Sequence, residues 1–194
     1  MVIESAHQAR IRTLDYNPNL PYMIATGADD GHIRIWDARS PMLPLLEIAN
    51  HSHWIYSVRF NHNHDQLLLS AGGDGLVNLE SVVSISSAQA VVLHNHQDDT
   101  NADFDKQDAS DNKHRNDSSE YDDEDCDDAD EDDVYEDDLA KPSDGLVAQF
   151  DDHETSVYAA VWSQADPWVF ASLSFDGRTV INTVPREEKY KILL

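Results

Sequence analysis

The chain has 194 residues and a formal net charge of −25, a length that allows one domain or slightly more. Binding to phosphates requires basic surface, so this acidic chain argues against nucleic acid and anionic membranes as partners. The N-terminus has no apolar signal region, and no apolar run approaches the ~18 residues of a membrane span, so we expect a cytoplasmic protein without direct membrane insertion.

Three Asp-Gly pairs mark a repeat that begins near the N-terminus and returns twice. In each unit a histidine stands 23 residues before the aspartate, and a Ser or Thr stands four residues before it. The three sets are His7, Thr26 and Asp30; His51, Ser70 and Asp74; and His153, Ser172 and Asp176. Such fixed offsets, together with apolar positions in the same register, are hard to obtain by chance and indicate an internal repeat.

Each unit predicts three short strands divided by turn residues, with Asn17-Pro18 and then the Asp-Gly pair as the turns of the first unit. A further run precedes the later histidines, as "LPLLEIA" and "GLVAQF". Four strands per ~40–45 residues is typical of a propeller blade. The innermost strands are predicted at Ile11–Tyr16, Ile55–Phe60 and Val157–Trp162, and the last blade is expected to lack its outer strand.

An acidic tract separates the second unit from the third. Residues 97–140 contain 21 acidic and three basic residues by count, so we predict a self-repelling, disordered insertion. The chain then divides into two blades at 1–96, the insertion at 97–140, and the last blade with a C-terminal tail at 141–194. The tract holds the only cysteine, Cys126, and a possible phosphorylation site, Ser119, which is followed three places later by Asp122.

The segment "GHIRIWD", with Trp36-Asp37, resembles the closing strand of the WD-repeat family. This resemblance implies an all-β WD40 β-propeller, here a partial one of about three blades with a disordered acidic insertion. It also implies that the histidine, hydroxyl, aspartate and tryptophan of a blade form one hydrogen-bonded network. His7, Thr26, Asp30 and Trp36 make a complete set, whereas Glu80 and Asn182 stand at the tryptophan position in the later units and should leave their networks without the last link.

Three blades cannot close a ring, because propellers have typically ~4–8 blades, and the resemblance implies seven. The chain is therefore expected to be a fragment, a truncated gene product, or a chain that needs partner blades. The first strand begins almost at Met1, which favours truncation.

The end of the chain, "SVYAAVWSQADPWVFASLSFDGRTVINTVPREEKYKILL", is similar to the C-terminal part of one WD-repeat family whose members bind vesicle-tethering complexes. The resemblance implies a non-enzymatic scaffold that binds subunits of a multisubunit tethering complex. It also implies action in endosomal recycling and endosome-to-Golgi retrograde transport, at the periphery of the trans-Golgi network and endosomes. The alternative is an adaptor subunit of a chromatin or ubiquitin-ligase assembly, which the long acidic tract keeps open.

Two kinds of chemistry remain to be weighed against a structural role. Ser70, His51 and Asp74 have the composition of a hydrolytic triad, but the set recurs in every unit, whereas a catalytic triad occurs once, in a pocket. Histidine pairs at 51/53, 62/64 and 94/96 could hold zinc but lack a matching third and fourth ligand. We therefore expect no catalytic residues, no bound metal and no cofactor.

Aromatic residues and arginines at the starts of the inner strands are the candidate partner contacts. Trp54, Tyr56 and Tyr158 begin the innermost strands of their blades, and Arg10, Arg12 and Phe175 occupy related positions. Aromatic and arginine side chains dominate the energies of many interfaces. Packing between blades is an equally good explanation for Trp54 and Tyr158.

Overall fold

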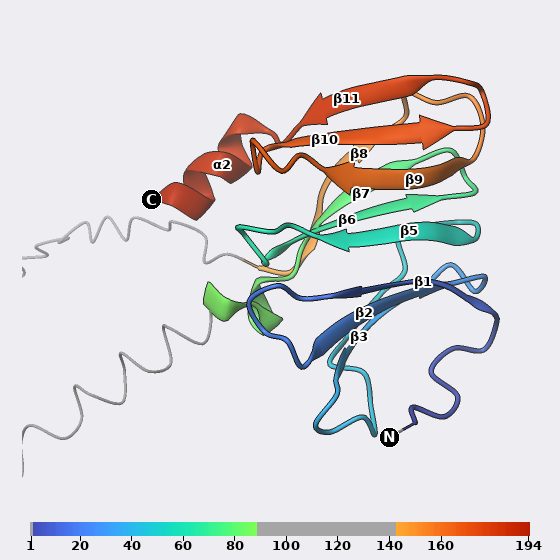
Figure 1. The fold of residues 1–194 in the computed structure, drawn as a ribbon, viewed down its shortest axis with the longest axis vertical. Helices are drawn as coiled ribbons and strands as arrows, with labels where there is room; N and C mark the ends of the chain where they lie inside the picture. Colours follow the sequence, from blue (N-terminus) through green and yellow to red (C-terminus); the bar gives the residue numbers. More distant parts are fainter. Residues whose placement is uncertain (1, 89–142) are drawn as a thin grey trace, which may run out of the picture.

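The structure, a computed structural model, describes residues 2–88 and 143–194 and shows three antiparallel sheets stacked on one another (Figure 1). The first sheet contains β1 (Ile11–Tyr16), β2 (Met23–Ala28), β3 (Ile33–Asp37) and β4 (Leu46–Ile48). The second contains β5 (Ile55–Phe60), β6 (Leu67–Gly72), β7 (Val77–Ser81) and β8 (Gly145–Phe150). The third contains β9 (Val157–Trp162), β10 (Val169–Ser174) and β11 (Thr179–Thr183).

These sheets confirm the prediction of an all-β partial propeller. The three innermost strands β1, β5 and β9 have the predicted bounds, and the third sheet has three strands where the others have four. Strand β8 follows the acidic tract in the sequence but pairs with β7, so it completes the second sheet. The predicted disorder of residues 97–140 and the site Ser119 lie outside the described residues.

Tight turns explain why the Asp-Gly pairs recur. Gly31, Gly75 and Gly177 join the second strand of each sheet to the third with φ angles of 78°, 84° and 80°. This left-handed conformation is open to glycine at little cost and strained for most other residues. The repeat therefore places a glycine where the hairpin backbone requires one.

The core lies between the sheets. Strands β1, β5 and β9 run side by side (Figure 1), and apolar side chains fill the two layers between neighbouring sheets. One layer includes Ala25, Ile33, Ile35, Ile55, Val58 and Phe60, and the other includes Leu69, Val77, Leu79, Ala160, Trp162 and Phe170. The second sheet is covered on both faces, and β6 and β7 are buried throughout.

The predicted C-terminal tail contains a helix, α2 (Arg186–Leu193). It begins after Pro185, carries Glu187 and Glu188 in its first turn and Lys191 in its last, an order that suits the helix dipole. Ile192 packs against the core between the second and third sheets. In the described ranges no helix is long and apolar enough to cross a membrane. A short 3₁₀ helix, η1 (Val83–Ile85), follows β7.

Replacement of Leu79 by alanine should lower the free energy of unfolding by about 2–5 kcal/mol, because the side chain is fully buried between two sheets and its loss leaves a cavity. The matched control is Leu193→Ala, at an exposed position of α2, which should change that free energy by less than about 0.5 kcal/mol. Denaturant titration followed by circular dichroism measures both. Equal effects would contradict the packing described here.

Candidate functional site

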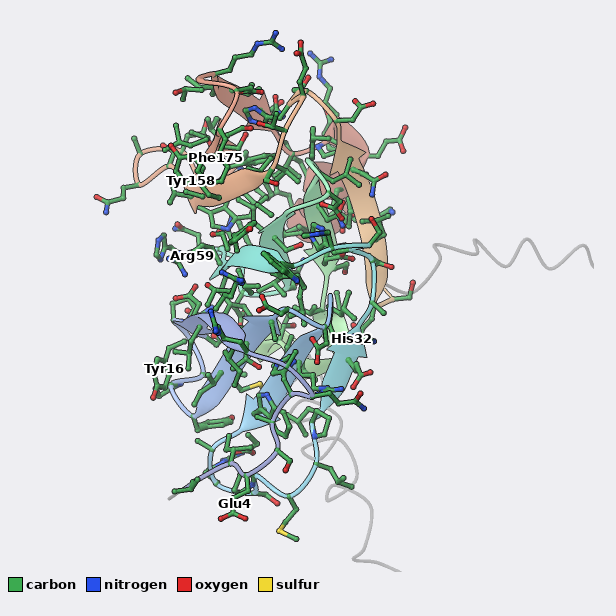
Figure 2. All side chains as sticks on the ribbon, turned by 90° about the vertical axis from the view of Figure 1, so that its right-hand side faces the viewer. Glu4, Tyr16, His32, Arg59, Tyr158 and Phe175 are labelled. Atoms are coloured by element: carbon green, nitrogen blue, oxygen red, sulfur yellow. The ribbon has the colours of Figure 1, made fainter. Side chains whose placement is uncertain are left out.

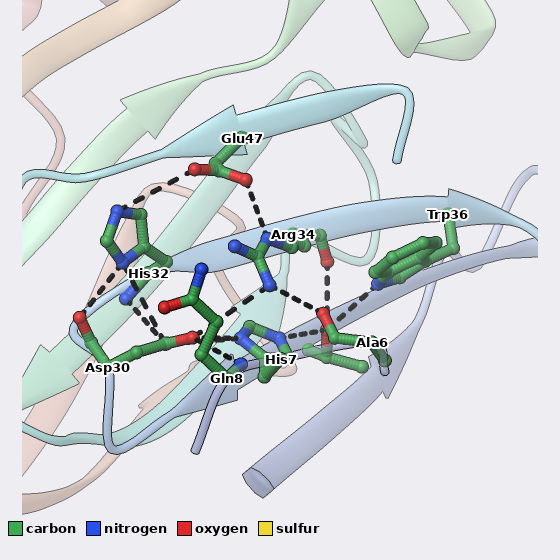
Figure 3. Close-up of polar contacts among 9 residues, drawn as sticks. Ala6, His7, Gln8, Asp30, His32, Arg34, Trp36 and Glu47 are labelled. Carbon is green, nitrogen blue, oxygen red and sulfur yellow. Dashed lines mark hydrogen bonds and ion pairs between the residues drawn. The ribbon is translucent and has the colours of Figure 1, made fainter. Parts of the chain in front are cut away.

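The first sheet holds the complete polar network (Figure 3). His7 lies with Nε2 at 2.8 Å from Thr26 Oγ1 and Nδ1 at 3.1 Å from Asp30 Oδ2, and the Trp36 indole donates to Thr26 Oγ1 at 3.0 Å. Burial lowers the pKa of His7, so its neutral form is favoured. In that form Nδ1 donates to Asp30 and Nε2 accepts from the Thr26 hydroxyl. The bonds then run in one direction, from Trp36 through Thr26 and His7 to Asp30.

Asp30 holds both the segment before β1 and the turn between β2 and β3 by hydrogen bonds. Its carboxylate accepts the backbone N–H groups of Gln8 at 3.3 Å and His32 at 3.1 Å. Burial opposes ionisation of Asp30, but these bonds and His7 outweigh it and lower the pKa of the carboxyl. Arg34, on β3, also holds the segment before β1, because its guanidinium donates to Ala6 O at 2.7 Å (Figure 3). The second unit has a matching contact, because Asn78 Nδ2 donates to Asn50 O at 3.1 Å, whereas the third unit has Val180 there, which has no side-chain donor.

The other two sheets repeat the histidine contacts. His51 lies 2.9 Å from both Ser70 Oγ and Asp74 Oδ2, and His153 lies 2.8 Å from Ser172 Oγ and 3.2 Å from Asp176 Oδ2. Hydrogen bonds lower the pKa of each aspartate against the opposing effect of burial. Both serines are almost fully buried, so a substrate could not reach these hydroxyls. The structural explanation of the triad-like composition is therefore the one the geometry supports.

The tryptophan position is occupied differently in the second and third sheets. Glu80 is fully buried and accepts two hydrogen bonds from Asn50 Nδ2, at 3.1 and 3.0 Å. Asn182 donates to Asp152 Oδ2 at 2.8 Å. Asn50 and Asp152 each directly precede the blade histidine, where the first unit has Ala6. An amide–carboxylate pair therefore stands where the first blade has alanine and tryptophan. In the second blade the amide precedes the histidine and the carboxylate is at the tryptophan position, and in the third blade the two are exchanged.

Arg12, Trp54 and Tyr56 form a single cluster across the first and second sheets. The Arg12 guanidinium carbon lies 4.5 Å from the Trp54 ring centroid and 5.1 Å from that of Tyr56, and the group forms an ion pair with Asp29. The hydrogen bond to Asp29 raises the pKa of Arg12. Trp54 nevertheless keeps 41% of its surface exposed, so it packs between blades and faces solvent.

A second aromatic group lies on the third sheet (Figure 2). The ring centroids of Tyr158 and Phe175 are 4.8 Å apart, and Phe175 is 71% exposed. Arg10 is exposed, and its carbonyl accepts the Asp29 backbone N–H at 2.9 Å. The six candidate contact residues thus divide into the Arg12 cluster, the Tyr158–Phe175 pair, and Arg10 beside the first.

Two further histidines pack against aromatic rings. His53 lies against Trp54 with ring centroids 4.9 Å apart, and His64 stacks on Trp168 at 4.4 Å, where burial lowers its pKa. Among the described residues no group of three or more His, Cys, Asp or Glu side chains is placed to hold a metal ion. The pair at 94/96 lies outside the described residues.

The stacked sheets and the histidine–hydroxyl–aspartate contacts repeated in each of them define a WD-repeat β-propeller protein. Two family comparisons agree: residues 1–80 match the EIPR1 beta-propeller, and residues 145–181 match the WD domain, G-beta repeat. The chain is thus similar to WD-repeat β-propellers over residues 1–80 and 145–181, and in particular to proteins named for an interaction with the EARP and GARP complexes.

Three of these relatives show the extent of the similarity. The chain is 44% identical over 193 residues to an EARP-interacting protein homolog of Gekko japonicus and 41% identical over 193 residues to EARP and GARP complex-interacting protein 1 of Homo sapiens. It is 42% identical over 191 residues to EARP-interacting protein 1 of Caenorhabditis elegans. The alignments cover 98–99% of this chain but only 43–44% of the relatives, so the chain spans less than half their length.

Replacement of Asp30 by alanine should lower the free energy of unfolding by about 1–3 kcal/mol, because a buried imidazole and two backbone N–H groups lose their acceptor. Asp151→Ala, at an exposed aspartate that precedes the third histidine, is the control and should have little effect. Urea titration at neutral pH compares them. An Asp30 variant as stable as the control would show that the network does not hold the blade together.

Glu80→Gln should stabilise the protein at pH 8, on the order of 1 kcal/mol, because the wild type buries a charge there. Burial raises the pKa of Glu80, while the Asn50 hydrogen bond and the charge of His51 oppose the rise. A folded pKa above the unfolded value gives stability at low pH that is lost as pH rises through the folded pKa. The difference between variant and wild type should therefore shrink as pH falls towards 4.5.

Asn50→Ala provides the contrast to Glu80→Gln. It removes the donor and leaves the buried carboxylate without its amide, so it should destabilise the protein, and more so at pH 8 than at pH 5. Thermal melts from pH 5 to pH 8 follow all three proteins. Parallel curves for wild type and Glu80→Gln would refute a raised pKa for this carboxyl.

Proposed function

We propose that this protein is a non-enzymatic scaffold that binds subunits of a vesicle-tethering complex of the EARP or GARP kind. The proposal places it on the cytoplasmic side of endosomes and the trans-Golgi network, in endosomal recycling and endosome-to-Golgi retrograde transport. Its main support is the similarity at 41–44% identity, over nearly the whole chain, to relatives named for interaction with those complexes.

The geometry supports a binding role. The candidate contact residues lie at or beside the ends of packed strands, so partner binding would order few additional groups. Arg12 is already held by Asp29 and by two aromatic rings, and Tyr158 lies against Phe175. Rigid aromatic side chains lose little conformational entropy on binding, so they make good anchors. Of the two groups, the Tyr158–Phe175 pair is the more available, because the Arg12 cluster also joins two blades.

The acidic tract contributes differently in this proposal. Its count of 21 acidic and three basic residues gives a net charge of −18, which would attract basic partner surfaces at a distance. Such charges are solvated and are screened beyond about 8 Å at physiological salt, so they raise association rates more than affinity.

The test is co-precipitation of EARP and GARP subunits with the epitope-tagged chain from eukaryotic cells. Phe175→Ala combined with Tyr158→Ala should reduce recovery at least about tenfold if the pair is a binding anchor worth more than about 1.4 kcal/mol. The control is Tyr190→Ala, an exposed aromatic residue on α2. Circular dichroism melts should show that all variants remain folded.

Two outcomes would redirect the proposal. Full recovery by the double variant would move the contact surface towards Trp54 and Tyr56. Recovery of no tethering subunit by the wild-type chain would reject the proposed function and favour an adaptor of a chromatin or ubiquitin-ligase assembly.

A further inference from the structure

The second blade is built from two segments of the chain that lie on either side of the insertion. The first segment, residues 2–88, supplies β1 to β7, and the second segment, residues 143–194, supplies β8 to β11 and α2 (Figure 1). Because β8 pairs with β7, the second segment provides the outer strand of a blade whose other three strands belong to the first. The boundary between the segments therefore runs through the second blade and along its interface with the third.

One of the two apolar layers of the core lies across this boundary. The first segment contributes Leu69, Val77 and Leu79 to the layer, and the second contributes Ala160 and Phe170, all of them fully buried. Removal of apolar surface from water is favourable whether or not the two surfaces belong to one continuous chain. The layer therefore holds the segments together without help from the connection.

Hydrogen bonds also cross the boundary. Trp162 Nε1 donates to Arg59 O at 3.1 Å, and Ser156 Oγ donates to Gly73 O at 3.0 Å. Hydrogen bonds have a preferred direction, whereas apolar contacts do not, so these bonds specify how the two segments are aligned.

The loop after each inner strand shows that the boundary resembles an ordinary interface between blades. Asn17 Nδ2 donates to Asp65 Oδ2 at 3.0 Å, inside the first segment, and Asn61 Nδ2 donates to Pro167 O at 2.6 Å, across the boundary. Asn61 stands 44 residues after Asn17, and Pro167 stands 102 residues after Asp65, so both bonds join the same positions of successive blades.

Side chains hold β8 in place on β7 at both of its ends. Just before β8, Asp144 Oδ1 accepts the Ser84 backbone N–H at 2.8 Å. Near the end of β8, Gln149 Nε2 donates to Asn78 Oδ1 at 3.0 Å, and Asn78 lies opposite Gln149 in the ladder. All of these contacts join described residues on the two sides of residues 89–142.

We propose that the two segments bind each other as separate chains, so that the three blades stay assembled when the connection between them is cut. A linker between two binding modules acts as an effective concentration of about a millimolar or less, and the cut removes only this contribution. The interface itself is unchanged, and we expect the cut pieces to associate with a Kd below about 1 µM.

This arrangement makes the charge of the insertion separable from the blades. Residues 97–140 carry 21 acidic and three basic residues of a chain with a net charge of −25. Cutting or removing them changes that charge without changing the contacts around Trp54, Tyr158 and Phe175. The inference does not depend on the proposed function.

The test places a protease recognition sequence within residues 97–140 of the full chain and cuts the folded protein. The product should give two bands on a denaturing gel, but one gel-filtration peak with the mass of the uncut chain at micromolar concentration and an unchanged circular dichroism spectrum. Pieces separated in urea and diluted together should regain that spectrum. Separate elution of the pieces at micromolar concentration, or loss of the native spectrum after cutting or remixing, would overturn the proposal.

A matched pair of variants tests whether this interface holds the cut pieces. Serine stands at the equivalent position of the third blade, where the Ser163 hydroxyl accepts the backbone N–H groups of Ala165 and Asp166, so serine suits the loop. In the cut protein Asn61→Ser should weaken association about tenfold, because it removes a bond across the boundary, and Asn17→Ser should change it by less than about twofold. Titration of one labelled piece with the other measures both. Equal effects of the two variants would overturn the proposal.

Discussion

Everything in this molecule depends on one constraint: a blade has two apolar faces and cannot bury either of them alone. The second sheet satisfies the constraint, because it lies between two neighbours and its strands β6 and β7 are buried throughout. The first and third sheets each leave part of one face exposed, at Leu14 and Tyr16 of the first and at Val161 and Ile181 of the third, so side chains of the same kind are buried in one sheet and exposed in another. Stability in such a stack is a sum over blades and the interfaces between them.

The polar networks carry out a different task from the apolar layers. Apolar packing is non-directional, so by itself it does not fix where the loops lie. The His–Asp contact does so, because it joins the segment before each innermost strand to the turn between the second and third strands. In the first blade the indole extends this chain of bonds to a third strand. The later blades keep the histidine contacts and replace the indole by an amide–carboxylate pair, which ties the third strand to the residue before the histidine instead.

The repeat offsets predicted the bounds of the inner strands and the members of each network, because both are set by local turn chemistry that recurs at fixed spacing. The partners of Glu80 and Asn182 were not predicted. Their signal lay in residue pairs 30 positions apart, Asn50 with Glu80 and Asp152 with Asn182, and it becomes visible only when Ala6 and Trp36 are set beside them. The helix α2 occurs once, so no repeat could indicate it. The bond from Arg34 to Ala6 O recurs in the second blade as a bond from Asn78 to Asn50 O, but the change of residue type hides the recurrence in the sequence.

The same comparison explains why exposed aromatic residues alone do not define a partner surface in this protein. Tyr16 and Phe175 are both largely exposed. Tyr16 occupies a position that is buried by a neighbouring blade in both other sheets, so its exposure reflects a missing neighbour. Phe175 follows the second strand of its sheet, just before the turn at Asp176 and Gly177, and lies against Tyr158 within its own blade. Its exposure therefore does not depend on blade packing, and it remains the better anchor for a partner of a different kind.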